Sequence, residues 1–358
     1  MPSSINRSPI ILRDPGQVGA SLDRLADQLR DGWRQAQRVK LPRTYKTITS
    51  IAVCGMGGSH LGADILRSVL SKELHVPMTI IADYTLPAWV GRQTLVICSS
   101  YSGSTEETLA ALRAALKRKA KIVVVTNGGA LARIAKKNKL PLYHYTATEN
   151  PSGQPRLGVA YGMMAMLACF RKLGLVKIST SDVEHLPTIA WEATKRYSAK
   201  KPMKNNPAKE LAVAMTNSIP LLIGAEWTAG NLHSLNNQIN ENAKTFVDWK
   251  LLPDLNHHLL EGLRNRAITK NVHALMILDT TYNKRTQKRF VLTAKILKQL
   301  GAKVSTYKPR GATPLEKAVD LLAFGGYLSW YFAAVRKVKP ADIPTVIFLK
   351  NELAKSKK

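Results

Sequence analysis

The feature that most constrains the fold is the alternation of short apolar runs with amphipathic stretches along the first half of the chain. Each apolar run has the length of a buried strand, and each stretch between them repeats its apolar residues at helical spacing. Strands that alternate with helices form parallel sheets covered on both faces, so we predict a doubly wound α/β domain. The predicted strands are Ser50–Cys54, Met78–Ile81, Thr94–Cys98, Lys121–Thr126 and Leu142–Tyr145, and the predicted helices are Val18–Gln37, Leu61–Leu70, Thr105–Lys119, Leu131–Asn138 and Val159–Phe170.

The second half of the chain repeats this rhythm, and the charged, proline-containing run Lys195–Lys209 is the best linker between the halves. We therefore expect an N-terminal helical segment at residues 1–40 and two three-layer αβα domains, at residues 41–195 and 205–358. The strands expected in the second domain are Ile219–Ile223, Ala274–Leu278 and Val304–Tyr307, and its helices are Trp227–Asn242, Asn283–Gln299 and Leu315–Val335.

Composition supports a globular protein with a large core, since 45% of the 358 residues are hydrophobic. Leu321–Val335 is too short for a membrane span and contains two glycines, so we interpret it as a buried helix. Ile5–Asp14 lacks the pattern of a secretory leader. The cysteines Cys54, Cys98 and Cys169 have no metal-ligand spacing, and buried free thiols predict the cytoplasm.

The formal net charge of +29 would ordinarily suggest a nucleic-acid partner. Lysines and arginines are spread along most of the chain, however, and do not gather in one arm or helix. We interpret this as a generally basic surface, with nucleic-acid binding unlikely. Electrostatic steering of anionic substrates remains an alternative, and added salt would weaken it.

An unusual density of hydroxyl groups follows the predicted strand Thr94–Cys98. Five of the seven residues in SSYSGST, at positions 99–105, are serine or threonine, and the two glutamates after them begin a predicted helix. The free backbone N–H groups and the dipole at the start of a helix favour an anion. A simple N-cap role could explain Ser102 or Ser104 alone, but not all five hydroxyls.

A glycine-rich turn, CGMGGSH, follows the first predicted strand at positions 54–60. It matches a dinucleotide-binding fingerprint only in part, because His60 stands where the last glycine belongs, and no Gly-Lys-Ser/Thr follows to make a Walker A loop. A purely structural tight turn remains possible. Taken with the hydroxyl-rich turn on a neighbouring strand, however, Gly55–Ser59 favours a site for a phosphate monoester.

These motifs resemble those of sugar isomerase (SIS) domains, in which GMGGS is followed by SSYSGSTEET. Three further motifs are similar to those of the bifunctional phosphoglucose/phosphomannose isomerases of archaea and bacteria, and the resemblance runs from about Ile51 to the C-terminus. These three motifs are PSGQPRLG at 151–158, NENAK at 240–244 and LPDLNH at 252–257. The resemblance implies two SIS-type domains and aldose–ketose isomerisation of a 6-phosphosugar through a cis-enediolate. The phosphate would be held by Gly58, Ser59, Ser100, Ser102 and Thr105.

The resemblance also implies roles for residues of the later motifs. Glu241 would be the base that moves a proton between C2 and C1, and the permanent cation of Arg156 would stabilise the enediolate. His257 would assist ring opening from across a homodimer interface. Its neighbour His258 stands where the family has asparagine, so this assignment could shift by one position. Taken singly, Glu241 could be a solvated acid at a helix end, and Arg156 a surface arginine.

A C-terminal lysine completes the family's site, and Lys350 is its best match among several lysines in the tail. Thr345 is a weak candidate for the threonine linked to use of both C2 epimers. His60 could contact phosphate, but a role as a helix cap is slightly favoured. The resemblance implies neither a cofactor nor a metal, because the enediol mechanism needs none.

Two alternatives remain open from the sequence. One is an isomerase acting on another 6-phosphosugar. The other is a regulator that binds a phosphosugar without converting it, although such regulators usually carry a DNA-binding helix-turn-helix and residues 1–45 contain only one clear helix.

Overall fold

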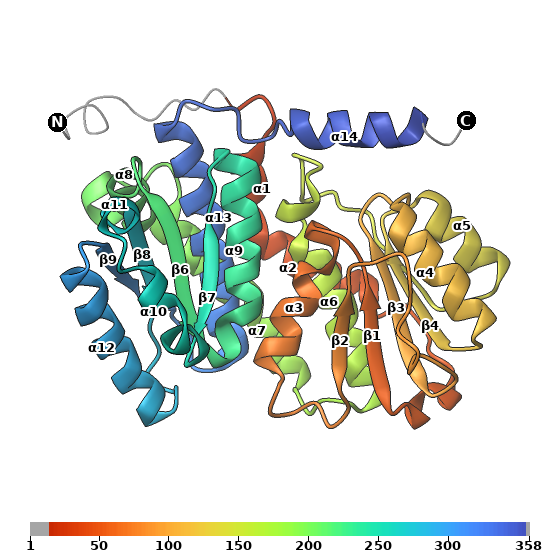
Figure 1. Ribbon diagram of the computed structural model, residues 1–358. Helices are drawn as coiled ribbons and strands as arrows, with labels where there is room; N and C mark the ends of the chain where they lie inside the picture. Colours follow the sequence, from red (N-terminus) through yellow and green to blue (C-terminus); the bar gives the residue numbers. More distant parts are fainter. Residues whose placement is uncertain (1–13, 356–358) are drawn as a thin grey trace.

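The computed structural model describes residues 14–355 and contains two parallel β-sheets, each packed between helices (Figure 1). The stretch Ile5–Asp14, which we predicted to lack a secretory leader, lies outside these residues except for Asp14. The first sheet has the strand order β2-β1-β3-β4-β5, and every pair of neighbours is parallel. Its strands are β1 (Ser50–Cys54), β2 (Met78–Ile81), β3 (Thr94–Ser100), β4 (Lys121–Thr126) and β5 (Leu142–His144), which confirms the predicted set.

The second sheet is also parallel, in the order β7-β6-β8-β9. One of its strands, β7 (Asp248–Leu252), was not predicted from the sequence. This edge strand is mostly half-buried and carries Asp248 and Lys250, so it lacks the apolar run that marks the central strands. The other strands are β6 (Ile219–Ala225), β8 (Val272–Ile277) and β9 (Lys303–Tyr307).

The helices of the first half lie close to their predicted positions. The exception is the N-terminal helix, which is interrupted at Arg24 into α1 (Val18–Asp23) and α2 (Leu25–Ala36) because the backbone of Arg24 leaves the helical region. The remaining helices are α3 (Gly58–Val69), α4 (Glu106–Lys117), α5 (Gly129–Lys137) and α6 (Val159–Leu173), with short 3-10 turns at η1 (Arg43–Thr47) before β1 and η2 (Pro155–Leu157) before α6.

The predicted linker is more ordered than its composition suggested. An unpredicted helix, α7 (Thr180–Tyr197), extends into it, and α8 (Pro207–Ala214) starts within it. The side chain of Asn206 is buried, accepts a hydrogen bond from the Lys209 N–H (3.2 Å) and donates one to the Tyr197 carbonyl (2.9 Å). This stretch therefore packs as part of the fold, and the domain boundaries stay a prediction.

In the second half, α13 (Pro314–Val335) is the central helix. By length and composition it could cross a membrane, but 89% of its apolar window is buried within the protein, which confirms the predicted buried helix. The last helix, α14 (Pro344–Lys355), buries no residue and lies along the top of the molecule in Figure 1. The other elements are η3 (Met203–Asn205), η4 (Glu226–Thr228), α9 (Ala229–Ala243), η5 (Asp254–His257), α10 (Leu259–Gly262), α11 (Arg266–Thr269) and α12 (Lys284–Gln299).

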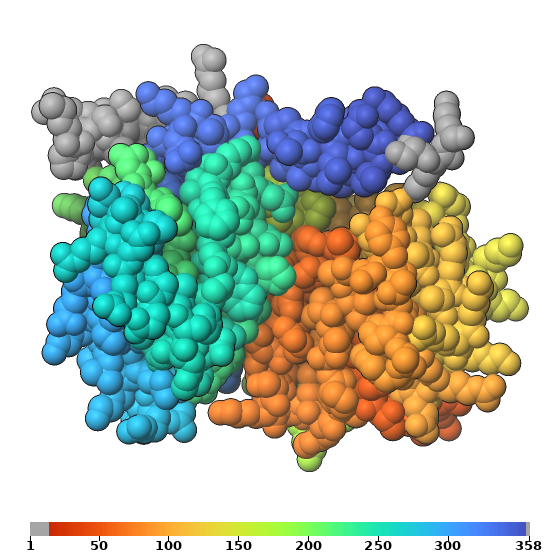
Figure 2. Space-filling view, viewed as in Figure 1, coloured from red at the N-terminus to blue at the C-terminus, as the bar shows by residue number. Residues whose placement is uncertain are grey.

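The two halves meet where α3 packs against α9 (Figures 1 and 2). The contact is so close that a Cβ atom on Gly230 would lie 2.2 Å from the carbonyl carbon of Asp64. Only glycine permits two helix backbones to approach in this way. The two helices therefore fix the position of one half against the other.

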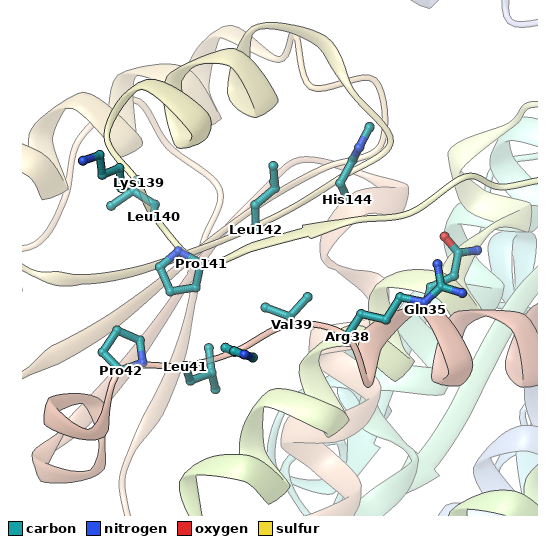
Figure 3. A pocket seen from close by; sticks show the side chains of 11 residues that line it. Gln35, Arg38, Val39, Leu41, Pro42, Lys139, Leu140, Pro141, Leu142 and His144 are labelled. Atoms are coloured by element: carbon teal, nitrogen blue, oxygen red, sulfur yellow. The ribbon is translucent and has the colours of Figure 1, made fainter.

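A cavity of about 640 Å³ opens between the segment at residues 38–42 and β5 (Figure 3). Its lining includes the cations Arg38, Lys40 and Lys139 but none of the predicted site residues. The cavity is therefore separate from the turns that carry the sequence motifs. The three cysteines are free and buried, as predicted.

Candidate active site

The glycine-rich turn and the hydroxyl-rich turn are brought together because β1 and β3 are adjacent in the sheet. The hydroxyl of Ser59, in the first turn of α3, accepts a hydrogen bond from the Tyr101 N–H (2.9 Å). In return, the Ser99 hydroxyl donates to the Ser59 carbonyl (2.7 Å). The two turns thus form one rigid surface at the N-terminus of α3, where an anion is favoured.

The hydroxyl groups of the second turn divide into two sets. Ser100 is fully buried, and its hydroxyl lies 2.8 Å from the Thr105 hydroxyl and 3.1 Å from the Gly103 N–H, which donates to it. Ser102 is exposed, while Ser59 and Thr105 are half-buried. Ser100 therefore holds the turn in shape, whereas Ser59, Ser102 and Thr105 can reach a ligand.

The glycine-rich turn and Arg156 are in direct contact through Gly58. A Cβ atom at this position would lie 2.6 Å from both the Arg156 nitrogen and the Pro155 carbonyl carbon. Glycine at position 58 therefore lets the start of α3 pack against η2. The sequence indicated Gly58 as a backbone position near an anion, and the structure adds that it joins the two predicted parts of the site.

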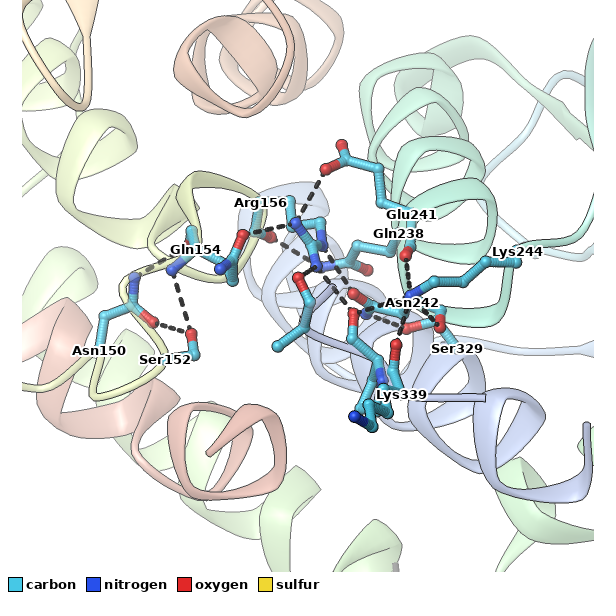
Figure 4. Close-up of polar contacts among 12 residues, drawn as sticks. Asn150, Ser152, Gln154, Arg156, Gln238, Glu241, Asn242, Lys244, Ser329 and Lys339 are labelled. Atoms are coloured by element: carbon cyan, nitrogen blue, oxygen red, sulfur yellow. Dashed lines mark hydrogen bonds and ion pairs between the residues drawn. The ribbon is translucent and has the colours of Figure 1, made fainter. Parts of the chain in front are cut away.

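Arg156 is buried, with a side chain only 1% exposed, and each of its five N–H groups has an acceptor (Figure 4). Nε donates to Asn242 Oδ1 (2.6 Å), and Nη1 donates to Gln154 Oε1 and to Glu241 Oε2 (both 2.8 Å). Nη2 donates to the carbonyls of Pro340 (2.9 Å) and Ala341 (3.3 Å). Burial lowers the pKa of Arg156, and the Glu241 carboxylate acts against that shift. Arg156 is therefore the centre of a network, which excludes the alternative of a surface arginine.

Glu241 occupies the last turn of α9 and is held at one oxygen only. Its Oε2 accepts from Arg156, whereas its Oε1 has no hydrogen-bond donor among residues 14–355. The side chain is 30% exposed, so the free oxygen can reach a ligand. The structure thus brings together two of the four predicted catalytic residues, as an oriented carboxylate beside a guanidinium.

Lys244, which the sequence analysis did not single out, closes the end of α9. Its Nζ donates to the carbonyls of Glu241 (2.9 Å) and Asn242 (3.3 Å) and also bonds the Lys339 carbonyl. Burial lowers the pKa of Lys244, and so does the nearby charge of Arg156. Lys244 and Asn242 belong to the NENAK motif and could have been found there, but the acceptors at Lys339–Ala341 are backbone groups without a sequence signal.

His257 is separated from Glu241 within one chain. Glu241 precedes β7 and His257 follows it, and a strand of five residues such as β7 spans about 13 Å. His257 is exposed and has no hydrogen-bond partner among the described residues, while Nε2 of His258 lies 3.5 Å from Asp254 Oδ2. A single chain therefore does not bring His257 to Glu241.

Lys350 and Thr345 both lie on the fully exposed helix α14. The side chain of Lys350 makes no polar contact with another residue in the described part of the chain. The structure therefore does not join Lys350 to Arg156 and Glu241, and its place in the site stays a prediction.

His60 does not cap α3, so the favoured interpretation was wrong. Its Nδ1 instead lies 2.9 Å from Oδ2 of Asp64, one turn further along the same helix, and His233 of α9 approaches the same oxygen. These three residues are also the ones, within residues 14–355, whose ligand atoms are close enough to hold a metal ion.

Comparison with known proteins agrees with this architecture. The profile of the SIS domain matches residues 46–171, and that of the bacterial phospho-glucose isomerase C-terminal SIS domain matches residues 204–353. A crystal structure of a hypothetical protein from Thermus thermophilus superposes with a TM-score of 0.74 at 17% identity, covering 96% of this chain and 91% of that chain. The fold and the two turns therefore define a protein with two SIS domains.

Among proteins with two SIS domains, curated relatives identify a particular family. The bifunctional phosphoglucose/phosphomannose isomerase of Caldicellulosiruptor bescii is 30% identical over 340 residues, which cover 94% of this chain and 99% of the relative. The enzyme of the same name from Aquifex aeolicus is 29% identical and covers 85% and 90% of the two chains. The chain belongs to the family of bifunctional phosphoglucose/phosphomannose isomerases.

Proposed function

We propose that the protein is an aldose–ketose isomerase that interconverts fructose 6-phosphate with glucose 6-phosphate and mannose 6-phosphate. The observation that carries the proposal is the geometry of Glu241, whose Oε2 is fixed by Arg156 while its Oε1 meets no donor among residues 14–355. A carboxylate oriented in this way, next to a rigid turn suited to phosphate, is what proton transfer on a bound phosphosugar requires.

The phosphate would lie at the N-terminus of α3, with the hydroxyls of Ser59, Ser102 and Thr105 as donors and Ser100 holding their turn in shape. The open-chain aldose would place C2 beside Oε1 of Glu241, which removes the C2 proton as the bonding electrons form the enediolate double bond. Glu241 then returns the proton to C1 while the proton of the C2 hydroxyl passes to the C1 oxygen, so that C2 becomes the carbonyl of the ketose. Loss of the C2 configuration in the enediolate allows both aldoses to form from one intermediate.

Arg156 has two tasks in this mechanism. Its hydrogen bond holds Glu241 in position, and its fixed positive charge stabilises the negative charge that develops on the enediolate. All five of its N–H groups are already bonded to protein acceptors. It therefore acts through its charge and its hold on Glu241, unless substrate displaces one of these acceptors.

Ring opening by His257 would require a second subunit, because one chain separates His257 from Glu241. A symmetric homodimer could supply His257 in trans. The apolar side chains exposed on α14, among them Ile347, Phe348 and Leu349, are consistent with a surface that a second subunit covers. The same contact would give Lys350 on α14 a place in the site.

The proposed reaction uses no cofactor and no metal in its chemical steps. Three free buried cysteines fit the reducing cytoplasm, which we propose as the site of action. No nucleic-acid or membrane partner enters the proposal.

The test is an NMR assay of fructose 6-phosphate with purified protein, in which both aldoses are followed over time. We expect both to form, and Glu241→Gln to lower kcat by at least about 100-fold, the scale of a lost acid–base group. Glu184→Gln, at an exposed glutamate of α7, is the matched control and should keep full activity.

Other outcomes would redirect the proposal. Formation of glucose 6-phosphate alone would remove the dual specificity. Conversion of a different 6-phosphosugar, in place of fructose 6-phosphate, would show that the protein is an isomerase with another substrate. Binding of fructose 6-phosphate without any conversion would favour a phosphosugar sensor.

A further inference from the structure

Two imidazoles and one carboxylate converge where the two halves of the protein meet. Nδ1 of His60 and Nδ1 of His233 lie 2.9 Å and 3.0 Å from the same oxygen, Oδ2 of Asp64. All three ligand atoms are within 4.8 Å of one another. His60 and Asp64 are one turn apart on α3, and His233 comes from the facing helix α9.

The backbone beneath these side chains is firmly held. Gly230 of α9 touches the backbone of Asp64, and its N–H donates to the Ser68 hydroxyl (3.0 Å), which donates in turn to the Asp64 carbonyl (2.8 Å). The ring of His233 stacks on Trp249, with centroids 5.8 Å apart. The three donor atoms are thus presented by rigid elements, as a preorganised site requires.

We propose that His60, Asp64 and His233 form a binding site for a divalent transition metal ion, with Zn²⁺ as the best match. Zinc takes histidine nitrogens and carboxylate oxygens at about 2.0–2.2 Å, so neighbouring ligand atoms lie roughly 3 Å apart around the ion. The two distances to Oδ2 already have this value. A set of two imidazoles and one carboxylate also binds zinc in preference to magnesium or calcium, which favour oxygen ligands.

Binding requires that the proton on Nδ1 of each histidine give way to the ion. Without metal, each ring donates its Nδ1–H to Asp64, whereas with metal the Nδ1 lone pair faces the ion and a ring proton sits on Nε2. Arg67 Nη2 lies 3.2 Å from the other carboxylate oxygen, Oδ1, and leaves Oδ2 for the metal. Such a bond to the non-coordinating oxygen is typical of the outer shell of metal sites.

The fourth position would be open to water. The His233 side chain is 29% exposed, whereas those of His60 and Asp64 are 7% and 5% exposed. Solvent and ions can therefore approach from the side of α9. The ion would cross-link α3, which carries Ser59, to α9, which carries Glu241, and would stabilise the contact between the two halves. This inference does not depend on the proposed isomerase activity.

The experiment uses the full-length chain without an affinity tag, stripped of metal by chelation. Titration calorimetry with Zn²⁺ should show one ion per chain, and Co²⁺ should give the visible absorption of a tetrahedral complex. His233→Phe keeps the ring that stacks on Trp249 but removes both nitrogens. It should weaken Zn²⁺ binding by more than about 10- to 100-fold, the loss caused by removing even an outer-shell partner.

The control is His185→Phe, at an exposed histidine of α7, which should bind Zn²⁺ like the wild type. Zn²⁺ should also raise the melting temperature of the wild type and of the control but not that of His233→Phe. A second variant, His60→Gln, should lose the Co²⁺ spectrum as well. No binding by the wild type, or equal binding by His233→Phe, would overturn the proposal.

Discussion

The carboxyl edges of the two sheets differ in chemistry although their strands are arranged alike. In the first half, β1 and β3 are followed by glycines and hydroxyls that leave N–H groups free for an anion. In the second half, β6 is followed by Glu226, whose Oε1 accepts from the Asn283 N–H (2.8 Å) just before α12. The second half thus carries a carboxylate at its edge, where the turns of the first half carry hydroxyls and glycines.

A second carboxylate strengthens this contrast. Asp279, which follows β8, accepts hydrogen bonds from Trp227 Nε1 (2.8 Å) and from Lys317 Nζ (2.8 and 3.0 Å). Glu226 would repel a phosphate at this edge, and Lys317 is already paired with Asp279. Two sheets with the same parallel arrangement can therefore differ at their carboxyl edges, because the residues of a few turns determine whether such an edge suits an anion.

The largest expected effect comes from breaking the internal charge pair of the second edge. The side chains of Lys317 and Asp279 are 9% and 3% exposed, so Asp279→Asn leaves a buried ammonium without its partner. We expect the free energy of unfolding to fall by about 3–5 kcal/mol, measured by urea denaturation. Asp248→Asn, which breaks the partly exposed Lys250–Asp248 pair, should cost no more than about 1 kcal/mol. Equal losses in the two variants would contradict the assigned role of Asp279.

A smaller effect should distinguish the two edges as ligand sites. Ser102→Ala removes an exposed hydroxyl from the first edge, and one hydrogen bond to a charged group is worth about 1.5–3 kcal/mol. KM for fructose 6-phosphate should therefore rise roughly 10- to 100-fold. The exposed Thr280, which follows β8 at the second edge, serves as the control, and Thr280→Ala should leave KM unchanged. A similar rise in both variants would show that the second edge also takes part in binding.

The smallest expected effect is the pH dependence of the Asp279–Lys317 pair. Burial by itself would raise the pKa of Asp279, but hydrogen bonds from Lys317 and Thr281 outweigh burial and hold the pKa below its ordinary value. Because the pKa is lowered on folding, this stabilisation is present above the ordinary carboxyl pKa of about 3.9 and is lost as the pH falls through the folded-state value. The difference in unfolding free energy between wild type and Asp279→Asn should shrink on acidification from about pH 7 to pH 3. A difference that stays constant over this range would contradict the assignment.

The sequence predicted the central strands well because each is a continuous apolar run, as Ile51–Cys54 and Leu95–Cys98 illustrate. It missed β7, which is a half-buried edge strand whose place depends on its pairing with β6. The break at Arg24 was missed as well, because the apolar pattern of α1 and α2 continues across it.

Within the candidate site, the sequence identified groups that belong to motifs. Arg156 and Glu241 were predicted and lie in contact. The buried position of Ser100 was not predicted, because five hydroxyls in one turn look alike until the turn has a shape. The pairing of His60 with His233 through Asp64 could not be predicted either. The two histidines lie far apart in the sequence and meet only through the packing of α3 on α9.

The hydrogen bond from Arg156 to the Pro340 carbonyl spans 184 residues of sequence. While the chain is being synthesised, the first half can fold before these acceptors exist. Nη2 of Arg156 then lacks its two carbonyl acceptors until the ribosome has added Pro340 and Ala341. The candidate active site is thus among the last parts of the molecule to be completed, and a nascent chain that stops early carries the two turns of the first half without the complete Arg156 network.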